Sequence, residues 1–360
     1  MRSYSIAFFG SSLVSAYWNG AATYYRGIIS ALHQRGHTTT FYEPDAYDRQ
    51  RHRDIGEPEY ARSVVYGTDD DSDVREMLSR SAGADIVVKA SGVGVFDELL
   101  EEAVAVMKGV VRVFWDVDAP ATLDRVGRNP ADPFRPLIPE FDLVLTYGGG
   151  PPVVKAYEGL GAKRCVPVYN ALDPSTHFPV PCEDRFKGLL GFLGNRMPDR
   201  EERVHEFFFK AAGGMPEHRF LLGGNGWESA VRGAENIAYF GHVYTKDHNA
   251  FNCSPLAVLN INRESMARYG FSPATRVFEA AGAESCLLTD AWTGIETFLE
   301  PGRECLVCND GDEVIEALSG LTPLRAREIG RAARKRVLQE HTYALRGVQV
   351  ERIFEESYGG

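Results

Sequence analysis

The chain has 360 residues, of which 44% are hydrophobic and 25% are charged, and its formal net charge is -11. This composition excludes a disordered or fibrous chain, because there is enough apolar surface to offset the entropy cost of ordering. The length predicts about two domains. An acidic balance argues against a broad surface that follows a nucleic-acid backbone, but it allows a small anionic ligand on a local arginine cluster.

The apolar stretches are too short for an export signal or a membrane span, so we expect a cytoplasmic protein without a membrane span. We expect the six cysteines to be reduced thiols. Cys305 and Cys308 have the CxxC spacing, but no second pair and no histidine accompany them. A buried strand is therefore the interpretation of this stretch, rather than a metal or redox site.

In the first half of the chain, short apolar runs alternate with helix-length amphipathic runs. The expected strands are residues 5–9, 38–42, 85–89, 110–115, 143–146 and 166–169. Between the first two, an apolar face at helical spacing predicts a helix that begins near Gly20, with Asn19 as its cap, and ends at Gly36.

Three prolines make residues 172–183 the best linker, and a second series of strands and helices follows it. The expected strands are residues 189–193, 220–222, 238–240, 257–261, 286–289 and 305–307, and the expected helices are 200–212, 273–283, 311–320 and 323–340. The alternation predicts an α/β protein with two Rossmann-like domains, residues 1–176 and 177–340. Ligands of such domains bind beyond the carboxyl ends of the parallel strands, so we expect the chemistry in a cleft where the domains face each other.

The stretch from Gly270 to Glu279 is the most informative one. Ser272 is a suitable N-cap and Pro273 suits the first helical position, so the helix would begin with free N–H groups that suit a diphosphate. Glu279, two turns further on, can accept hydrogen bonds from the two hydroxyls of a ribose. The alternative is an ordinary amphipathic helix in which Glu279 pairs with Arg276.

A second loop, Gly194-Asn195-Arg196, follows an expected strand. Arg196 would reach a diphosphate from the opposite side, supported by Arg200 or Arg268, unless these arginines simply lie on the surface of a helix start. The phosphate motifs of Walker and dinucleotide-binding proteins are absent from the sequence, which argues against a dinucleotide oxidoreductase. The predicted binding residues are Gly194, Asn195, Arg196, Arg200, Arg268, Gly270, Ser272, Thr275, Arg276 and Glu279.

Asp116 and Asp118 follow an expected strand of the first half, where a general base would be useful. The alternative is a structural loop in which one of them caps the next helix. We interpret His37 as a partner of a helix C-terminus. The other histidines show no metal-ligand spacing, so no metal site is predicted.

The order of these segments resembles the GT-B glycosyltransferases, and more narrowly the CgeB-like proteins with a glycosyl-transferase-1-type C-terminal domain. The segments are Arg35-Gly36-His37, Trp115-Asp116-Val117-Asp118, Tyr169-Asn170-Ala171-Leu172-Asp173-Pro174, Gly194-Asn195-Arg196, the stretch from Gly270 to Glu279, and His341-Thr342-Tyr343. The resemblance implies that the C-terminal domain binds a nucleoside-diphosphate sugar, with Glu279 as the ribose carboxylate. It also implies that the N-terminal domain binds the acceptor, that residues 341–360 form a helix crossing back to that domain, and that no catalytic metal is used.

One position departs from the resemblance. Many retaining GT-B enzymes carry an acidic residue eight positions before the ribose carboxylate, where this chain has Phe271. The retaining or inverting outcome therefore stays open at this point. If transfer is inverting, Asp116 or Asp118 would deprotonate the acceptor hydroxyl.

The predicted function is a metal-independent, hexosyltransferase-type transfer of a sugar from a UDP- or dTDP-sugar to a hydroxyl-bearing acceptor, without a further cofactor. The acceptor would be a saccharide, a metabolite, a protein or a modified nucleobase. A nucleotide-sugar epimerase is one alternative and predicts turnover of the donor without an acceptor. A non-catalytic nucleotide-sugar-binding protein of a polysaccharide assembly system is the other, and predicts binding without turnover.

Overall fold

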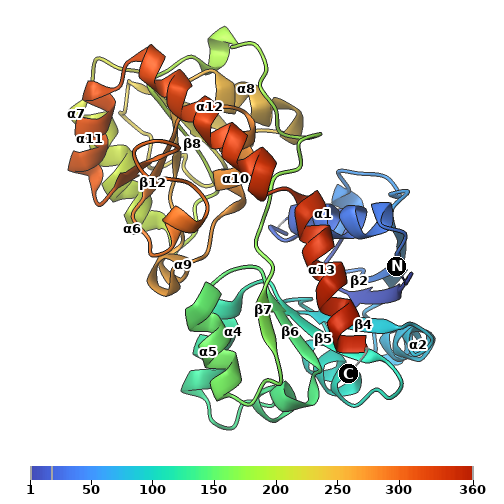
Figure 1. Cartoon of the computed structure of the whole chain (residues 1–360). Coiled ribbons are helices and arrows are strands. Elements are labelled where there is room, and N and C mark those ends of the chain that lie inside the picture. The colour runs from blue at the N-terminus through green and yellow to red at the C-terminus, as the bar shows by residue number, and fades with distance from the viewer. Residues whose placement is uncertain (1, 18, 359–360) are drawn as a thin grey trace. The chain divides into compact units, whose positions relative to one another are not determined.

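The computed structural model describes residues 2–17 and 19–358. Met1, Trp18, Gly359 and Gly360 belong to the expected domain ranges 1–176 and 341–360 but lie outside the described residues. The chain divides into two compact units, each built on one sheet (Figure 1). Unit 1 comprises Met1–Tyr169 with Tyr343–Gly360, and unit 2 comprises Asn170–Thr342.

Unit 1 contains a parallel sheet in the order β3-β2-β1-β4-β5-β6-β7. Its strands are β1 (Ser5–Phe9), β2 (Thr38–Pro44), β3 (Arg62–Tyr66), β4 (Ile86–Ala90), β5 (Val111–Asp116), β6 (Leu143–Thr146) and β7 (Cys165–Pro167). The central strands β4 and β6 are buried along their whole length and are apolar apart from Lys89 and Thr146, because both faces of the sheet are covered. The strand order reverses between β1 and β4, so the carboxyl ends of these two strands form the ligand-binding edge typical of such sheets.

The helices of unit 1 are α1 (Ala22–Gln34), α2 (Ser72–Ser81), α3 (Asp97–Ala105), α4 (Ala119–Arg128), α5 (Gly150–Gly159) and α13 (Tyr343–Tyr358), with 3-10 turns at Arg49–His52 and Arg135–Glu140. The chain ends in α13, which lies along α1 (Figure 1). Two glycines permit this close approach: a Cβ on Gly27 would lie 2.4 Å from the Tyr343 ring, and a Cβ on Gly347 would lie 2.8 Å from Cβ of Ala31.

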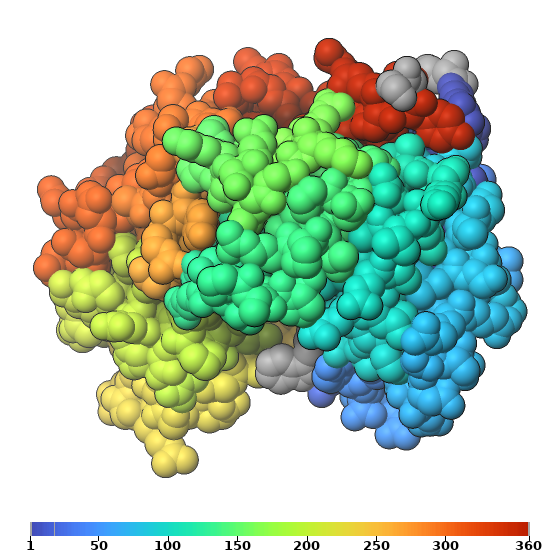
Figure 2. Space-filling view, turned by 90° about the horizontal axis from the view of Figure 1, so that it is seen from below, coloured from blue at the N-terminus to red at the C-terminus, as the bar shows by residue number. Residues whose placement is uncertain are grey.

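Polar contacts also join the last helix to unit 1. Glu351 is buried and pairs with Arg35, and its Oε1 lies 3.3 Å from Nε2 of His37. The end of α13 lies beside the N-terminal residues (Figure 2), where the Arg2 guanidinium sits 3.8 Å from the centroid of the Tyr358 ring. The last helix is thus part of the packing of unit 1.

Unit 2 contains a parallel sheet in the order β10-β9-β8-β11-β12-β13. The strands are β8 (Leu190–Leu193), β9 (Phe220–Gly223), β10 (Ile237–Gly241), β11 (Ala257–Asn260), β12 (Leu287–Asp290) and β13 (Leu306–Cys308). The helices are α6 (Glu201–Val204), α7 (Lys210–Gly214), α8 (His248–Cys253), α9 (Glu264–Tyr269), α10 (Thr275–Gly282), α11 (Gly311–Gly320) and α12 (Pro323–Glu340). A π-helical turn, His205–Phe209, joins α6 to α7, and 3-10 turns lie at Asp184–Phe186, Thr245–Asp247 and Ile295–Thr297. Here the strand order reverses between β8 and β11.

The predicted α/β class with two parallel sheets is confirmed, but some local predictions are wrong. Strand β3 was missed. Helix α1 begins at Ala22 with Ala21 at the N-cap position, because the side-chain oxygen of Asn19 accepts instead from Ser11 Oγ at 2.9 Å. The amide of Asn19 donates to the carbonyls of Ser12 and Ser15 within the same loop.

The start of α10 also differs from the prediction. The helix begins at Thr275 with Ala274 at the N-cap position. Ser272 Oγ donates to the Gly270 carbonyl at 2.9 Å, because Gly270 and Phe271 form a turn with φ angles of 70° and 45°. Ser272 therefore stabilises the turn before the helix rather than the helix itself.

The CxxC stretch behaves as its apolar context predicts. Cys305 and Cys308 are buried free thiols on either side of Leu306 and Val307. Burial raises the pKa of Cys305 to about 12, which disfavours the reactive thiolate.

Candidate functional site

The loop after β8 is held in place by the loop after β9. Gly194 N–H donates to the Gly223 carbonyl at 2.9 Å, and the indole N–H of Trp227 donates to the Gly194 carbonyl at 2.8 Å. The Asn195 side-chain oxygen accepts from the N–H of Asn225 at 2.9 Å. These contacts fix Gly194 and Asn195 at the carboxyl end of β8, at the point where the strand order of unit 2 reverses.

Two arginines converge on this strand end. Arg200 Nη2 donates to the Asn195 carbonyl at 2.6 Å, and Arg276 Nη2 donates to the Leu193 carbonyl at 3.5 Å. A Cβ on Gly194 would lie 2.7 Å from Arg200 Nη2, so the glycine makes room for that guanidinium. The Nε atoms of both arginines are buried and make no hydrogen bond.

The positive charge at this strand end is not fully neutralised. Burial, with the charges of Arg276 and Arg263, lowers the pKa of Arg200 to about 10 against the opposing charge of Asp199. Burial also lowers the pKa of Arg276, against the attraction of Glu279. Two partly desolvated guanidinium groups with unused N–H donors can bind an anion such as a diphosphate.

Glu279 lies in the second turn of α10 and its side chain is 14% exposed. Burial by itself would raise the pKa of Glu279, but the charge of Arg276 holds that pKa below its ordinary value. Arg276 Nη1 lies 3.7 Å from Glu279 Oε2. The carboxylate is therefore ionised at neutral pH, and the predicted pair between Arg276 and Glu279 is present as well.

The start of α10 is close to these charged groups in the sequence and lacks a side-chain cap. The first N–H groups of a helix have no partner within the helix, so this end can accept an anion. Arg276 and Glu279 extend from the first two turns of the same helix. The structure thus brings together Gly194, Asn195, Arg200, Arg276 and Glu279 of the predicted set.

Arg196 and Arg268 are placed differently. Arg196 pairs with Glu201, and its Nη1 donates to Ser229 Oγ at 3.1 Å. Arg268 is exposed on α9, with its guanidinium 5.7 Å from the centroid of the Tyr269 ring. Arg196 is thus neutralised by its own carboxylate, whereas Arg200 has no ion pair within 4.0 Å among the described residues.

Sequence reasoning missed two histidines beside Glu279. One ring nitrogen each of His177 and His248 and one carboxylate oxygen of Glu279 lie within 4.8 Å of one another. The three residues come from the segment before β8, from α8 and from α10, so no spacing in the sequence signals the group. Only the packing of unit 2 brings them together.

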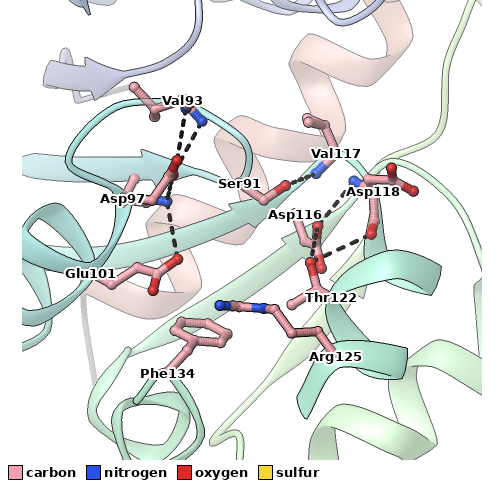
Figure 3. Close-up of polar contacts among 12 residues, drawn as sticks. Ser91, Val93, Asp97, Glu101, Asp116, Val117, Asp118, Thr122, Arg125 and Phe134 are labelled. Carbon is pink, nitrogen blue, oxygen red and sulfur yellow. Dashed lines mark hydrogen bonds and ion pairs between the residues drawn. The ribbon is translucent and has the colours of Figure 1, made fainter. Parts of the chain in front are cut away.

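In unit 1, Asp116 is fully buried at the end of β5 (Figure 3). It accepts hydrogen bonds from the hydroxyl of Tyr157 at 2.5 Å, from Thr122 Oγ1 at 3.1 Å and from the N–H of Asp118 at 3.0 Å. Burial raises the pKa of Asp116 despite these donors. This carboxyl group joins the first turn of α4 and the last turn of α5 to the sheet, and the partly exposed Asp118 lies at the N-cap position of α4.

A second buried cluster of unit 1 also escaped the sequence analysis. Lys89 Nζ, inside β4, lies 2.5 Å from Asp97 and 3.1 Å from Glu101. The other contacts of Asp97 are the N–H groups of Val93 and Gly94, at 3.2 and 2.7 Å (Figure 3). The signal was a lysine within an apolar strand, followed by two acids at i and i+4 of the next helix. The cluster fixes the loop between β4 and α3.

The chain resembles solved glycosyltransferase structures over nearly its full length. Sucrose-phosphate synthase from Thermosynechococcus elongatus matches with a TM-score of 0.73 and 12% identity, covering 99% of this chain and 100% of that one. HepE of Anabaena in complex with UDP-glucose matches with a TM-score of 0.68 and 12% identity, covering 98% and 100%. AviGT4, a glycosyltransferase involved in avilamycin A biosynthesis, matches with a TM-score of 0.63 and 16% identity, covering 99% and 98%.

These likenesses establish a GT-B fold. Residues 200–352 match the family described as glycosyl transferase-like. The resemblance inferred from the sequence is thereby confirmed. None of the curated proteins matches the chain in sequence. No helix among residues 2–17 and 19–358 is long and apolar enough to cross a membrane.

Proposed function

We propose that the protein transfers a sugar, of hexose type, from a nucleoside-diphosphate sugar to a hydroxyl group of an acceptor. The observation that carries this proposal is the convergence of Arg200, Arg276 and the uncapped start of α10 in unit 2, with the ionised Glu279 two turns into the same helix. An anion site beside an ionised carboxylate has the chemistry that a nucleoside diphosphate requires.

In this proposal the diphosphate binds the two guanidinium groups and the N–H groups at the start of α10. The ribose hydroxyls donate to Glu279. Negative charge builds up on the diphosphate as the sugar leaves, and these fixed donors stabilise it without a metal ion. A uridine nucleotide is the first candidate, since HepE was solved in complex with UDP-glucose.

Unit 1 is the proposed acceptor-binding part. If transfer inverts the anomeric centre, Asp118 suits the role of base better than Asp116, because the Asp116 side chain is fully buried and accepts three hydrogen bonds. Asp116 would then be a positioning residue that holds the backbone N–H of Asp118.

The test is isothermal titration calorimetry with UDP, dTDP, GDP and ADP. It is followed by an assay of donor hydrolysis with a nucleotide sugar that carries the tightest-binding nucleotide. We expect one nucleotide to bind and Glu279→Gln to weaken it by about tenfold to a hundredfold, since each charge-assisted hydrogen bond contributes about 1.5–3 kcal/mol. Glu316→Gln, an exposed site on α11, is the matched control. Absence of binding by every nucleotide, or an unchanged affinity in Glu279→Gln, would contradict the proposal.

A further inference from the structure

We propose that His177, His248 and Glu279 form a zinc site in unit 2, and that Zn²⁺ bound there displaces a nucleotide from Glu279. The metal site stands on the geometry of unit 2 alone, whereas the displacement rests on the proposed function. This zinc ion would differ in role from a catalytic metal ion, because it would compete with the donor nucleotide for Glu279 rather than bind the diphosphate.

The hydrogen bonds of the two histidines leave one lone pair on each ring for a metal. The Nε2 atom of His248 lies 3.2 Å from the carbonyl oxygen of Val243, which only accepts, so Nε2 carries the proton of the neutral ring. Nδ1 of His177 lies 3.0 Å from the hydroxyl of Thr176, which donates its proton to the Asp173 carbonyl at 3.2 Å, so Nδ1 donates to that hydroxyl and carries the proton of the neutral ring. The other nitrogens, Nδ1 of His248 and Nε2 of His177, are buried and have no hydrogen-bond partner.

The cluster therefore brings together three atoms with lone pairs that can bind a metal: one nitrogen of each histidine ring and one carboxylate oxygen of Glu279. His177 is 6% exposed, and the side chain of Glu279 is 14% exposed, so bulk water does not readily solvate them. Burial lowers the pKa of His248 to about 4, so this ring is neutral at pH 7. A neutral imidazole and an ionised carboxylate are protonation states that bind a metal.

The side chains are held in place by contacts among three segments. Asn249, the second residue of α8, donates from its amide to the Thr176 carbonyl at 2.9 Å and accepts from the N–H of Phe178 at 3.3 Å. These two bonds fix His177 between them. A Cβ on Gly282 of α10 would lie 3.0 Å from the His177 carbonyl oxygen, so the glycine lets the segment approach the helix that carries Glu279.

The ligand type and spacing suit zinc. Two imidazoles and one carboxylate, with a fourth position for water, are a common zinc ligand set, and ligand atoms about 2.1 Å from the ion lie about 3.4 Å apart in a tetrahedron. The present limit of 4.8 Å requires the ligand atoms to close by about 1.4 Å at most, which small side-chain rotations supply. Arg276 Nη1 lies 3.7 Å from Glu279 Oε2 and also donates to Asn252, so Zn²⁺ would share the carboxylate with this guanidinium.

The first experiment titrates metal-free full-length protein with Zn²⁺ by calorimetry and with Co²⁺ by visible spectroscopy. We expect one ion per chain and the intense visible bands of tetrahedral Co²⁺. His177→Gln and His248→Gln should each weaken Zn²⁺ binding by at least about tenfold and abolish these bands. His218→Gln, an exposed histidine outside the cluster, is the matched control and should bind as the parent does.

Folding of each variant is checked by its melting temperature without metal. A parent protein that binds no Zn²⁺, or variants of His177 and His248 that bind it as the parent does, would overturn the metal site. This outcome does not depend on whether any nucleotide binds.

The second experiment measures UDP affinity with and without Zn²⁺ in the parent and in the double variant His177→Gln/His248→Gln. We expect Zn²⁺ to weaken UDP binding at least tenfold more in the parent than in the double variant. Complexation of UDP by free Zn²⁺ is equal in both experiments, so the difference between the two proteins reports the metal site. If Zn²⁺ leaves UDP affinity unchanged in the parent, the displacement is refuted. If UDP binds neither protein while the Zn²⁺ titration succeeds, the proposed function fails and the metal site stands.

Discussion

The charged cluster around Lys89 in unit 1 and the one around Arg200 and Glu279 in unit 2 differ in how completely their members are paired. In unit 1, Lys89 contacts two carboxylates, and Asp97 also accepts from two backbone N–H groups. In unit 2, Arg200 and Arg276 keep buried Nε donors without a partner, and His177 and His248 keep buried ring nitrogens without one. The first arrangement holds a loop, whereas the second has unused hydrogen-bonding capacity that a ligand can take up.

This difference distinguishes a structural cluster from a binding site better than charge content does. Both clusters lie near the carboxyl ends of parallel strands, and both combine cations with carboxylates. Removing one member of a fully paired cluster should lower the free energy of unfolding. Removing one member of an incompletely paired cluster should instead weaken ligand binding. The following variants test that distinction.

The largest effect is expected for Lys89→Ala. Removal of the ammonium leaves Asp97 and Glu101 without their cation inside unit 1, and breaking a buried pair costs about 3–5 kcal/mol. The free energy of unfolding from urea denaturation measures this loss. Lys155→Ala, at an exposed position of α5, should change it by less than about 0.5 kcal/mol. A loss below about 1 kcal/mol in Lys89→Ala would show that the cluster is not structural.

Arg200→Ala should instead act on the ligand. Loss of a charge-assisted hydrogen bond to the diphosphate costs about 1.5–3 kcal/mol, so UDP should bind roughly tenfold to a hundredfold more weakly. Binding of uridine, which has no phosphate, should stay unchanged. Calorimetry of UDP and of uridine therefore separates the contribution of the diphosphate from that of the nucleoside. Arg232→Ala, an exposed arginine of unit 2, is the control. Equal losses for UDP and uridine would place Arg200 away from the diphosphate.

His248 should make the metal-free protein less stable in acid. Its pKa of about 4 in the folded state lies below the ordinary value of 6.5, so the unfolded chain binds the proton first as pH falls. Stability is then lost from pH 6.5 down to about 4, by about 1.4 kcal/mol per pH unit. Denaturation at several pH values should show a shallower slope in His248→Gln than in the parent, and equal slopes would contradict this assignment.

The smallest effect is expected for Gly194→Ala. The new Cβ would meet the end of the Arg200 side chain at 2.7 Å, and a flexible side chain moves aside at little cost in stability. UDP affinity should fall severalfold, less than in Arg200→Ala. In a double-mutant cycle, Gly194→Ala should have no further effect once Arg200 is removed, whereas additive losses would contradict a role through Arg200.

Much of the fold followed from local patterns. Apolar runs such as Ile86–Ala90 and Leu143–Thr146 predicted the central strands to within one residue, because strands covered on both faces need continuous apolar side chains. Helix starts were predicted less well. Ser272 and Asn19 are residue types that favour the N-cap position, but each uses its side chain to stabilise the adjacent loop. N-cap propensity is a property of a single residue type, whereas the surrounding loop determined which hydrogen bond each of these side chains makes.

The sequence by itself determined the class of this protein: two α/β halves, and a glycine turn followed by a helix that carries Arg276 and Glu279. These features depend on neighbours within a few positions, where periodicity and turn chemistry act. Only the tertiary structure decided that Arg196 pairs with Glu201, while Arg200 has no ion pair within the part of the chain that the structure describes, and that Asp116 is buried. It also decided that His177 and His248 meet Glu279, because packing of distant segments, unlike local pattern, determines which side chains share one environment.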